Sequence, residues 1–172
     1  MQNEQNLDRQ IDQLVQDAPQ DGVTPGITKV ISAVLKAIAM QLQHSSYYIL
    51  QAQDGSWLLA TLSNNNSPEV EKNVVYAYCS KTAANLERLK LGDRNLVCAE
   101  MGIIEILFRL VGLKEVDSLI LFDKSTDTQR GMEISRGELQ GLCEKQMKKL
   151  KNKQRKLQQK QSTKKGFTSD IA

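Results

Sequence analysis

Alternating oxygen-bearing residues near position 125 are the first candidate for chemistry. Asp123 follows an apolar segment, and Ser125 and Asp127 stand at alternate positions after it. A phosphoryl-transfer aspartate usually has a second acid two residues on, where this chain has Ser125. A calcium loop has glycine at its sixth position and glutamate at its twelfth, which here are Thr128 and Ile134. The pattern is therefore typical of a polar turn that closes a strand pair.

Cys79 is the candidate nucleophile. It lies between a predicted strand and the predicted start of a helix, where the helix dipole lowers the pKa of a thiol. A nucleophile also needs a base, and the single histidine, His44, falls at the end of a predicted helix, where a structural role is expected. The other two cysteines, Cys98 and Cys143, lie far away in the sequence, so no close pair of zinc ligands exists. We expect no catalytic residue, no metal site and no cofactor, and a thiol- or aspartate-dependent enzyme is the least favoured alternative.

A run of basic residues near the C-terminal end is the third candidate. Residues 1 to 144 hold 13 Lys and Arg against 19 Asp and Glu, a net charge of −6, whereas residues 145 to 172 carry +9. Such a split points to an anionic partner for the basic arm, or to docking of the arm on its own body. As a helix, the arm would carry cations around most of its circumference, which argues against an amphipathic membrane helix. We predict that its ten basic residues contact a partner: Lys145, Lys148, Lys149, Lys151, Lys153, Arg155, Lys156, Lys160, Lys164 and Lys165.

The spacing of apolar residues predicts the elements that position these groups. Helical spacing is present in four segments, which are 24–42, 80–89, 101–112 and 136–150. A weaker periodic set in residues 1–23 predicts an amphipathic helix that either frays or docks; it consists of Leu7, Ile11, Leu14 and Val15. Strand-like runs are present in five segments, which are 47–50, 57–62, 74–78, 116–122 and 131–135. Asp54 and Gly55 predict a tight turn that joins the first two strands into a hairpin. Thr24 is the predicted N-cap of the first helix, and Ser135 with Glu138 forms a predicted capping box at the last one.

The length and element order predict one α+β domain. A chain of 172 residues is long enough for one core but short for two domains and a tail. We expect a mostly antiparallel or mixed sheet of four to five strands with packed helices, followed by a basic C-terminal arm that is helical or disordered. The expected divisions are a weakly ordered N-terminal arm at 1–23, the α+β domain at 24–150 and a basic tail at 151–172.

The layout between residues 47 and 142 resembles that of SseB-type small α/β domains. The resemblance consists of a strand pair around Asp54-Gly55, the strand at 74–78 running into a helix at Ser80, an apolar helix at 103–110, and the strand at 119–123. It departs from such domains at Asp123-Lys124, where they typically place Asn-Pro. The resemblance implies a non-catalytic accessory module without a cofactor.

The remaining composition bears on location and partners. No apolar run approaches the roughly 18 residues that span a bilayer, and three scattered cysteines fit a reducing cytoplasm. We therefore expect a cytoplasmic, non-enzymatic adaptor or regulatory module that binds a protein partner, with the basic arm contacting an anionic surface. The alternative is an RNA-binding or ribosome-associated protein that uses the arm at 145–165. A separate candidate for RNA binding is a stacking platform of strand aromatics, which are Tyr47, Tyr48, Trp57, Tyr76 and Tyr78.

Overall fold

The computed structural model describes residues 2–124 and 127–167 and shows an α+β domain with a mixed sheet, as predicted. Its helices are α1 (Gln2–Asp17), α2 (Thr24–Ala39), α3 (Lys81–Leu91), α4 (Ile103–Gly112) and α5 (Arg136–Phe167). Its strands are β1 (Ser46–Gln51), β2 (Ala60–Asn64), β3 (Ser67–Tyr78), β4 (Val97–Gly102), β5 (Ser118–Phe122) and β6 (Met132–Ser135). The described part therefore has six strands instead of four to five, because no strand was predicted at β4.

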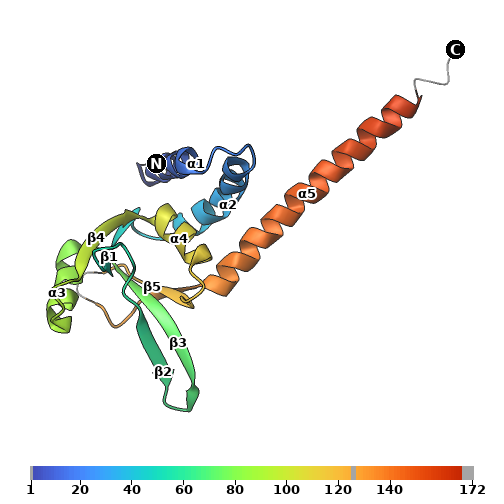
Figure 1. Ribbon diagram of the computed structural model, residues 1–172. Coiled ribbons are helices and arrows are strands. Elements are labelled where there is room, and N and C mark those ends of the chain that lie inside the picture. Colours follow the sequence, from blue (N-terminus) through green and yellow to red (C-terminus); the bar gives the residue numbers. More distant parts are fainter. Residues whose placement is uncertain (1, 125–126, 168–172) are drawn as a thin grey trace.

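The sheet runs in the order β4-β1-β3-β5-β6, and β2 pairs with the first half of β3 (Figure 1). β3 and β5 are parallel, with Tyr76 opposite Ile120, whereas the other strand pairs are antiparallel. Parallel pairing places the carboxyl ends of β3 and β5 side by side, so Cys79 and Asp123, which follow these strands, are brought to the same edge.

The predicted hairpin between residues 47–50 and 57–62 does not form as a strand pair. The turn at Gly55 is present, with φ of 86°. Among the described residues, the only strand-type pairing between the segments on either side of this turn is one isolated bridge, between Gln51 and Trp57. Both edges of β1 are already in use, since β4 pairs along one edge and the end of β3 along the other. β2 therefore continues past β1 and forms a hairpin with β3, which extends away from the body (Figure 1).

The main core lies between one face of the sheet and a layer formed by α1, α2, α4 and the first turns of α5 (Figure 1). Tyr47 and Ile49 of β1 and Leu119 and Leu121 of β5 point into it and are fully buried. α3 packs on the opposite face, over a smaller cluster in which Phe122 stacks on two tyrosines. Most of the buried apolar surface is therefore on the helix-rich face.

The weak helix predicted in the N-terminal arm is present as α1, and of the two alternatives, fraying or docking, the structure shows docking. Leu7 of α1 is fully buried, with Ile11 and Leu14 packed beside it. The side chain of Gln10 donates from Nε2 to the carbonyl of Ser45 at 2.8 Å and accepts at Oε1 from the N–H of Ile104 at 3.0 Å. This N–H is one of the free donors at the start of α4, so α1 both covers the core and caps another helix.

The start of α2 differs by one residue from the predicted cap. Thr24 is the first helical residue, so the N-cap position is Val23, whose side chain makes no capping hydrogen bond. The cap is supplied by the carboxylate of Asp21, which accepts from the N–H of Thr24 at 2.6 Å and from its hydroxyl at 2.5 Å. The hydroxyl of Thr24 and the backbone N–H groups lower the pKa of Asp21 to about 2.

Candidate partner-binding site

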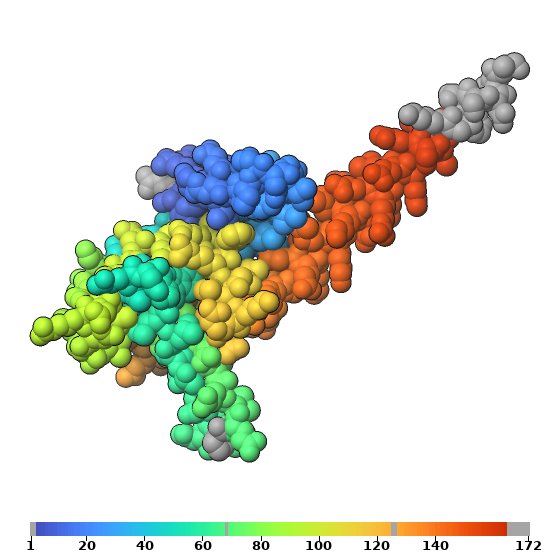
Figure 2. Space-filling view, viewed as in Figure 1, coloured from blue at the N-terminus to red at the C-terminus, as the bar shows by residue number. Residues whose placement is uncertain are grey.

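α5 begins in the core and ends far from it. The predicted N-cap is present, because Ser135 Oγ accepts from the N–H of Glu138 at 3.4 Å, but among the described residues the return bond of a capping box, from the Ser135 N–H to the Glu138 side chain, does not form. Leu139 and Cys143 are buried, and Gln140 donates to the carbonyl of Val111 at 3.0 Å. From Leu150 onward every described side chain of the helix is exposed, and the helix extends away from the body as a single rod (Figures 1 and 2). The tail expected at 151–172 therefore continues the last helix as far as residue 167.

The basic residues of the C-terminal arm whose side chains the structure describes are available for contact. Nine of the ten predicted binding residues have described side chains, and each of the nine is exposed. None of the nine forms an ion pair with any residue that the structure describes. The side chain of Lys165 lies outside the described residues. For the described part of the chain, the arm is thus not docked on the acidic body. Of the two explanations of the charge split, an anionic partner is the one that remains.

Most of these cations lie on one face of the helix. Successive spacings of four, four, three, four and four residues place six lysines along one line, which we call the lysine stripe: Lys145, Lys149, Lys153, Lys156, Lys160 and Lys164. At 1.5 Å per residue the stripe is about 28 Å long. Lys148, Lys151 and Arg155 form a second basic face. The two faces together cover most of the helix circumference, and the stripe is the longer of the two.

The lysine stripe starts at the rim of an apolar groove between α2 and α5. The groove has a volume of about 360 Å³ and is lined by Val34, Ile38 and other residues of α2, facing Leu142, Lys145 and Lys149 of α5. Leu142 is 44% exposed and lies three residues before Lys145, on the same face of the helix. A second hollow of about 290 Å³ adjoins it and shares Ile38 and Leu142. One continuous surface thus passes from apolar to basic.

Sequence reasoning found the lysines but missed the groove. The spacing that places Leu142 in line with the lysine stripe was present in the sequence. The α2 side of the groove was not, because Val34 and Ile38 looked like core positions of an amphipathic helix. Only the packing of α2 against α5 leaves part of that face open.

The stripe carries an electrostatic cost that an anionic partner would relieve. Like charges three or four residues apart destabilise a helix by about 0.2 to 0.5 kcal/mol per pair. The five neighbouring pairs along the stripe therefore cost about 1 to 2.5 kcal/mol at low salt by the same measure. Carboxylates or phosphates bound along this face would add attractive interactions with the lysines, and these would offset the repulsion between neighbouring lysines.

The fold also brings together the candidate groups for catalysis. Tyr47 Oη donates to Asp123 Oδ1 at 2.5 Å, and His44 Nε2 lies 3.1 Å from the backbone carbonyl of Asp123. The N–H of Cys79 donates to the carbonyl of Phe122 at 3.1 Å, which ties the end of β3 to the end of β5. Ser125, the third residue of the alternating pattern, lies outside the described residues.

Two groups of this cluster have raised pKa values. Burial raises the pKa of the Cys79 thiol and the Asp123 carboxylate raises it further, while a backbone hydrogen bond lowers it by a smaller amount. A thiolate nucleophile has a lowered pKa instead. Burial and the hydrogen bond to Asp123 also raise the pKa of Tyr47. Within residues 2–124 and 127–167, no group of three His, Cys, Asp or Glu side chains is placed to hold a metal ion.

The strand aromatics do not form one exposed stacking surface. Tyr47 and Trp57 belong to the main core, on the helix-covered face of the sheet. Tyr78 is buried on the opposite face beneath α3, and Tyr76 stacks on Phe122 at 5.7 Å between ring centroids. The aromatic platform considered for RNA is therefore not present among the described residues.

No protein-family model matches the chain, and no curated protein matches its sequence. The resemblance to SseB-type domains therefore stays a prediction. Among the described helices, none combines the length and the apolar character needed to cross a membrane.

Proposed function

We propose that this protein is a non-enzymatic, cytoplasmic adaptor or regulatory module that binds an acidic, amphipathic segment of a partner protein. Apolar side chains of that segment enter the groove between α2 and α5. Its acidic side chains follow along the lysine stripe. The observation that carries the proposal is the continuity of the two surfaces, since Leu142, Lys145 and Lys149 line the groove and also lie on the face from which the stripe extends.

The groove is what favours a protein over a nucleic acid. A phosphate backbone is held by cations and polar donors and has no apolar group to place against Val34, Ile38 and Leu142. An amphipathic peptide helix uses both surfaces, because its apolar and charged residues recur with the same period of three to four residues as those of α5. The acidic body supports this reading as well, since its net charge of −6 opposes wrapping of a polyanion around the domain.

RNA binding through the arm is the second candidate, and the free projection of α5 favours it. The helix beyond Leu150 is exposed on all sides, so a nucleic acid can reach both basic faces (Figure 2). If six phosphates were neutralised by the stripe, log K would fall with log salt with a slope of about −4 for a single strand. The two candidates are separated by the groove variants described next.

The test is affinity capture from native lysate, with and without nuclease treatment, using four forms of the full chain, quantified by mass spectrometry at low and high salt. One form is unchanged and one carries Leu142→Gln in the groove. A third carries Lys149→Gln, Lys153→Gln and Lys156→Gln in the stripe. The matched control removes three charges from the second basic face by Lys148→Gln, Lys151→Gln and Arg155→Gln.

We expect one protein partner to be lost with both the groove form and the stripe form and to be kept by the control. Three exposed ion pairs at about 0.2 to 1 kcal/mol each correspond to a loss of roughly 3- to 100-fold for the stripe form. Equal losses with both charge-removal forms, together with no effect of Leu142→Gln, would contradict a face-specific peptide site. Capture that disappears on nuclease treatment would instead support the RNA candidate.

A further inference from the structure

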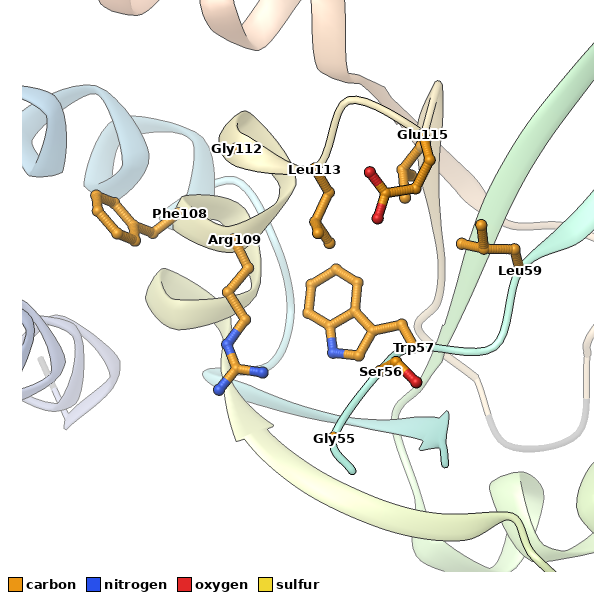
Figure 3. A pocket seen from close by; sticks show the side chains of 10 residues that line it. Gly55, Ser56, Trp57, Leu59, Phe108, Arg109, Gly112, Leu113 and Glu115 are labelled. Carbon is orange, nitrogen blue, oxygen red and sulfur yellow. The ribbon is translucent and has the colours of Figure 1, made fainter. Parts of the chain in front are cut away.

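A second cleft, separate from the α5 site, lies between the end of α4 and the turn that follows β1 (Figure 3). It has a volume of about 460 Å³. Its apolar lining includes Trp57, Phe108, Leu113 and Val116. Its size is that of a small-molecule site, and apolar walls with a few polar groups are the usual make-up of such sites.

The indole of Trp57, which lines this cleft, carries an unpaired and covered donor. Trp57 is only 9% exposed, and its Nε1 is buried without a hydrogen-bond partner among the described residues. A buried N–H that lacks an acceptor loses the hydration that it had in the unfolded chain, so such groups are rare in native proteins. In Figure 3 the nitrogen-bearing edge of the indole is turned toward the side of the cleft on which Arg109 lies.

Two charged side chains of opposite sign flank the indole. Arg109 lies on one side and Glu115 on the other (Figure 3). Arg109 donates from one terminal nitrogen to Glu105 at 2.6 Å, which leaves further N–H donors of its guanidinium for another acceptor. Its side chain is 43% exposed. Since Nε1 has almost no accessible surface, a ligand reaches it only when neighbouring side chains shift, and Arg109 is the side chain that we expect to shift.

We propose that this cleft binds a monocarboxylic acid with a compact apolar body. The carboxylate accepts from Trp57 Nε1–H and from the guanidinium of Arg109, and the apolar body packs against Leu113 and Val116. Glu115 disfavours a second negative charge, which makes the site selective for monoacids over diacids. A free acid and the C-terminal residue of a peptide chain share this chemistry.

One internal group competes for the same donor. Gln51 lies opposite Trp57 in the isolated bridge, and its Oε1 is also buried without a partner among the described residues. Rotation of the Gln51 amide would offer the indole an acceptor from within the protein. The experiment therefore has to distinguish a ligand from Gln51.

The test follows the indole N–H resonance in ¹H–¹⁵N correlation spectra of the full chain. Trp57 is the single tryptophan, so this resonance needs no assignment. The probes are 4-methylpentanoate as the free acid, N-acetylleucine as the mimic of a C-terminal residue, 4-methylpentanamide as the neutral control and glutarate as the diacid. We expect saturable downfield shifts with one or both monoacids and none with the amide or the diacid.

Three variants connect the shift to the cleft. Arg109→Gln should weaken binding by about tenfold or more, because a charge-assisted hydrogen bond is lost, and the exposed Arg94→Gln should leave it unchanged. Gly112→Leu should abolish binding without unfolding the chain, since a Cβ at this helical position meets nothing within 4 Å and the added side chain fills the cleft. Absence of any shift with both monoacids, equal shifts with acid and amide, or an indole resonance that responds to Gln51→Ala but not to acid would each overturn the proposal. The α5 site is untouched by these variants, so this result is independent of the proposed adaptor function.

Discussion

Replacing Leu7 by alanine tests whether α1 is part of the folded domain. Leu7 is fully buried in the main core and is flanked on the same helix by Ile11 and Leu14. In a frayed N-terminal arm this side chain would be exposed in both the folded and the unfolded state, and its truncation would cost almost nothing. In the docked helix, the truncation leaves a cavity against α2 and α4, on which α1 packs.

The expected cost follows from the burial. Truncation of a fully buried leucine to alanine costs about 2 to 5 kcal/mol, since both the transfer free energy and the cavity contribute. For a chain of this size, each kcal/mol lowers Tm by about 2 to 4 °C, so Leu7→Ala should lower Tm by roughly 4 to 20 °C. Gln10 joins α1 to the start of α4. If the truncation of Leu7 loosens α1, this contact weakens too, and part of the core beneath α1 becomes exposed.

The assay is urea unfolding followed by the fluorescence of Trp57, which is buried in the core and is the sole tryptophan. This probe is insensitive to the free end of α5, whose melting would complicate a helix signal. Leu89→Ala is the matched control, since Leu89 is helical and 68% exposed, and it should change the free energy of unfolding by less than about 0.5 kcal/mol. A Leu7→Ala change as small as that of the control would refute the docked position of α1.

Three further predictions concern local features. Thr24→Ala should raise the pKa of Asp21 from about 2 toward its usual value, because the hydrogen bond from the Thr24 hydroxyl is the largest cause of the lowering; NMR titration measures this. The stability that this cap contributes is fully present above the usual pKa of an aspartate and is lost as pH falls through about 2. Gly131→Ala should destabilise the chain by about 1 to 3 kcal/mol in urea unfolding, because the added Cβ would press against side chains of β5, whereas Gly141→Ala, with open space around its Cβ, should stabilise it by about 0.5 to 1 kcal/mol. Added salt should increase the helix signal of the full chain by circular dichroism more than that of a chain ending at Leu150, because screening weakens the repulsion along the lysine stripe; an equal response of both chains would contradict this origin.

Local sequence signals predicted most helices correctly and failed where strand pairing decided the outcome. Ser80 caps α3 as expected, accepting from the N–H of Ala83 at 3.2 Å, and Ser135 begins α5. β4 was missed because its central residues, Cys98-Ala99-Glu100, have weak strand preference and extend only through pairing with β1. The turn at Asp54-Gly55 was correct in itself, but a turn does not fix which strands pair after it.

The candidate site divides in the same way. The exposed lysines and their spacing could be predicted, since helical periodicity depends on the chain alone. The groove could not, because its walls come from α2 and α5, which are about a hundred residues apart in the sequence. The gathering of His44, Cys79 and Asp123 was equally hidden, since it follows from the parallel pairing of β3 with β5.

The sequence by itself determined the charge division, the N-caps of α3 and α5, the α+β class and the spacing of the lysines, because each of these depends on residue type and on spacings of a few positions. Tertiary structure decided that α1 docks, that β2 pairs with β3, and that an apolar groove opens where the lysine stripe begins. These outcomes depend on which surfaces meet across long separations. Such contacts form only when the whole core assembles, since burial of apolar surface is shared among all the elements that cover it.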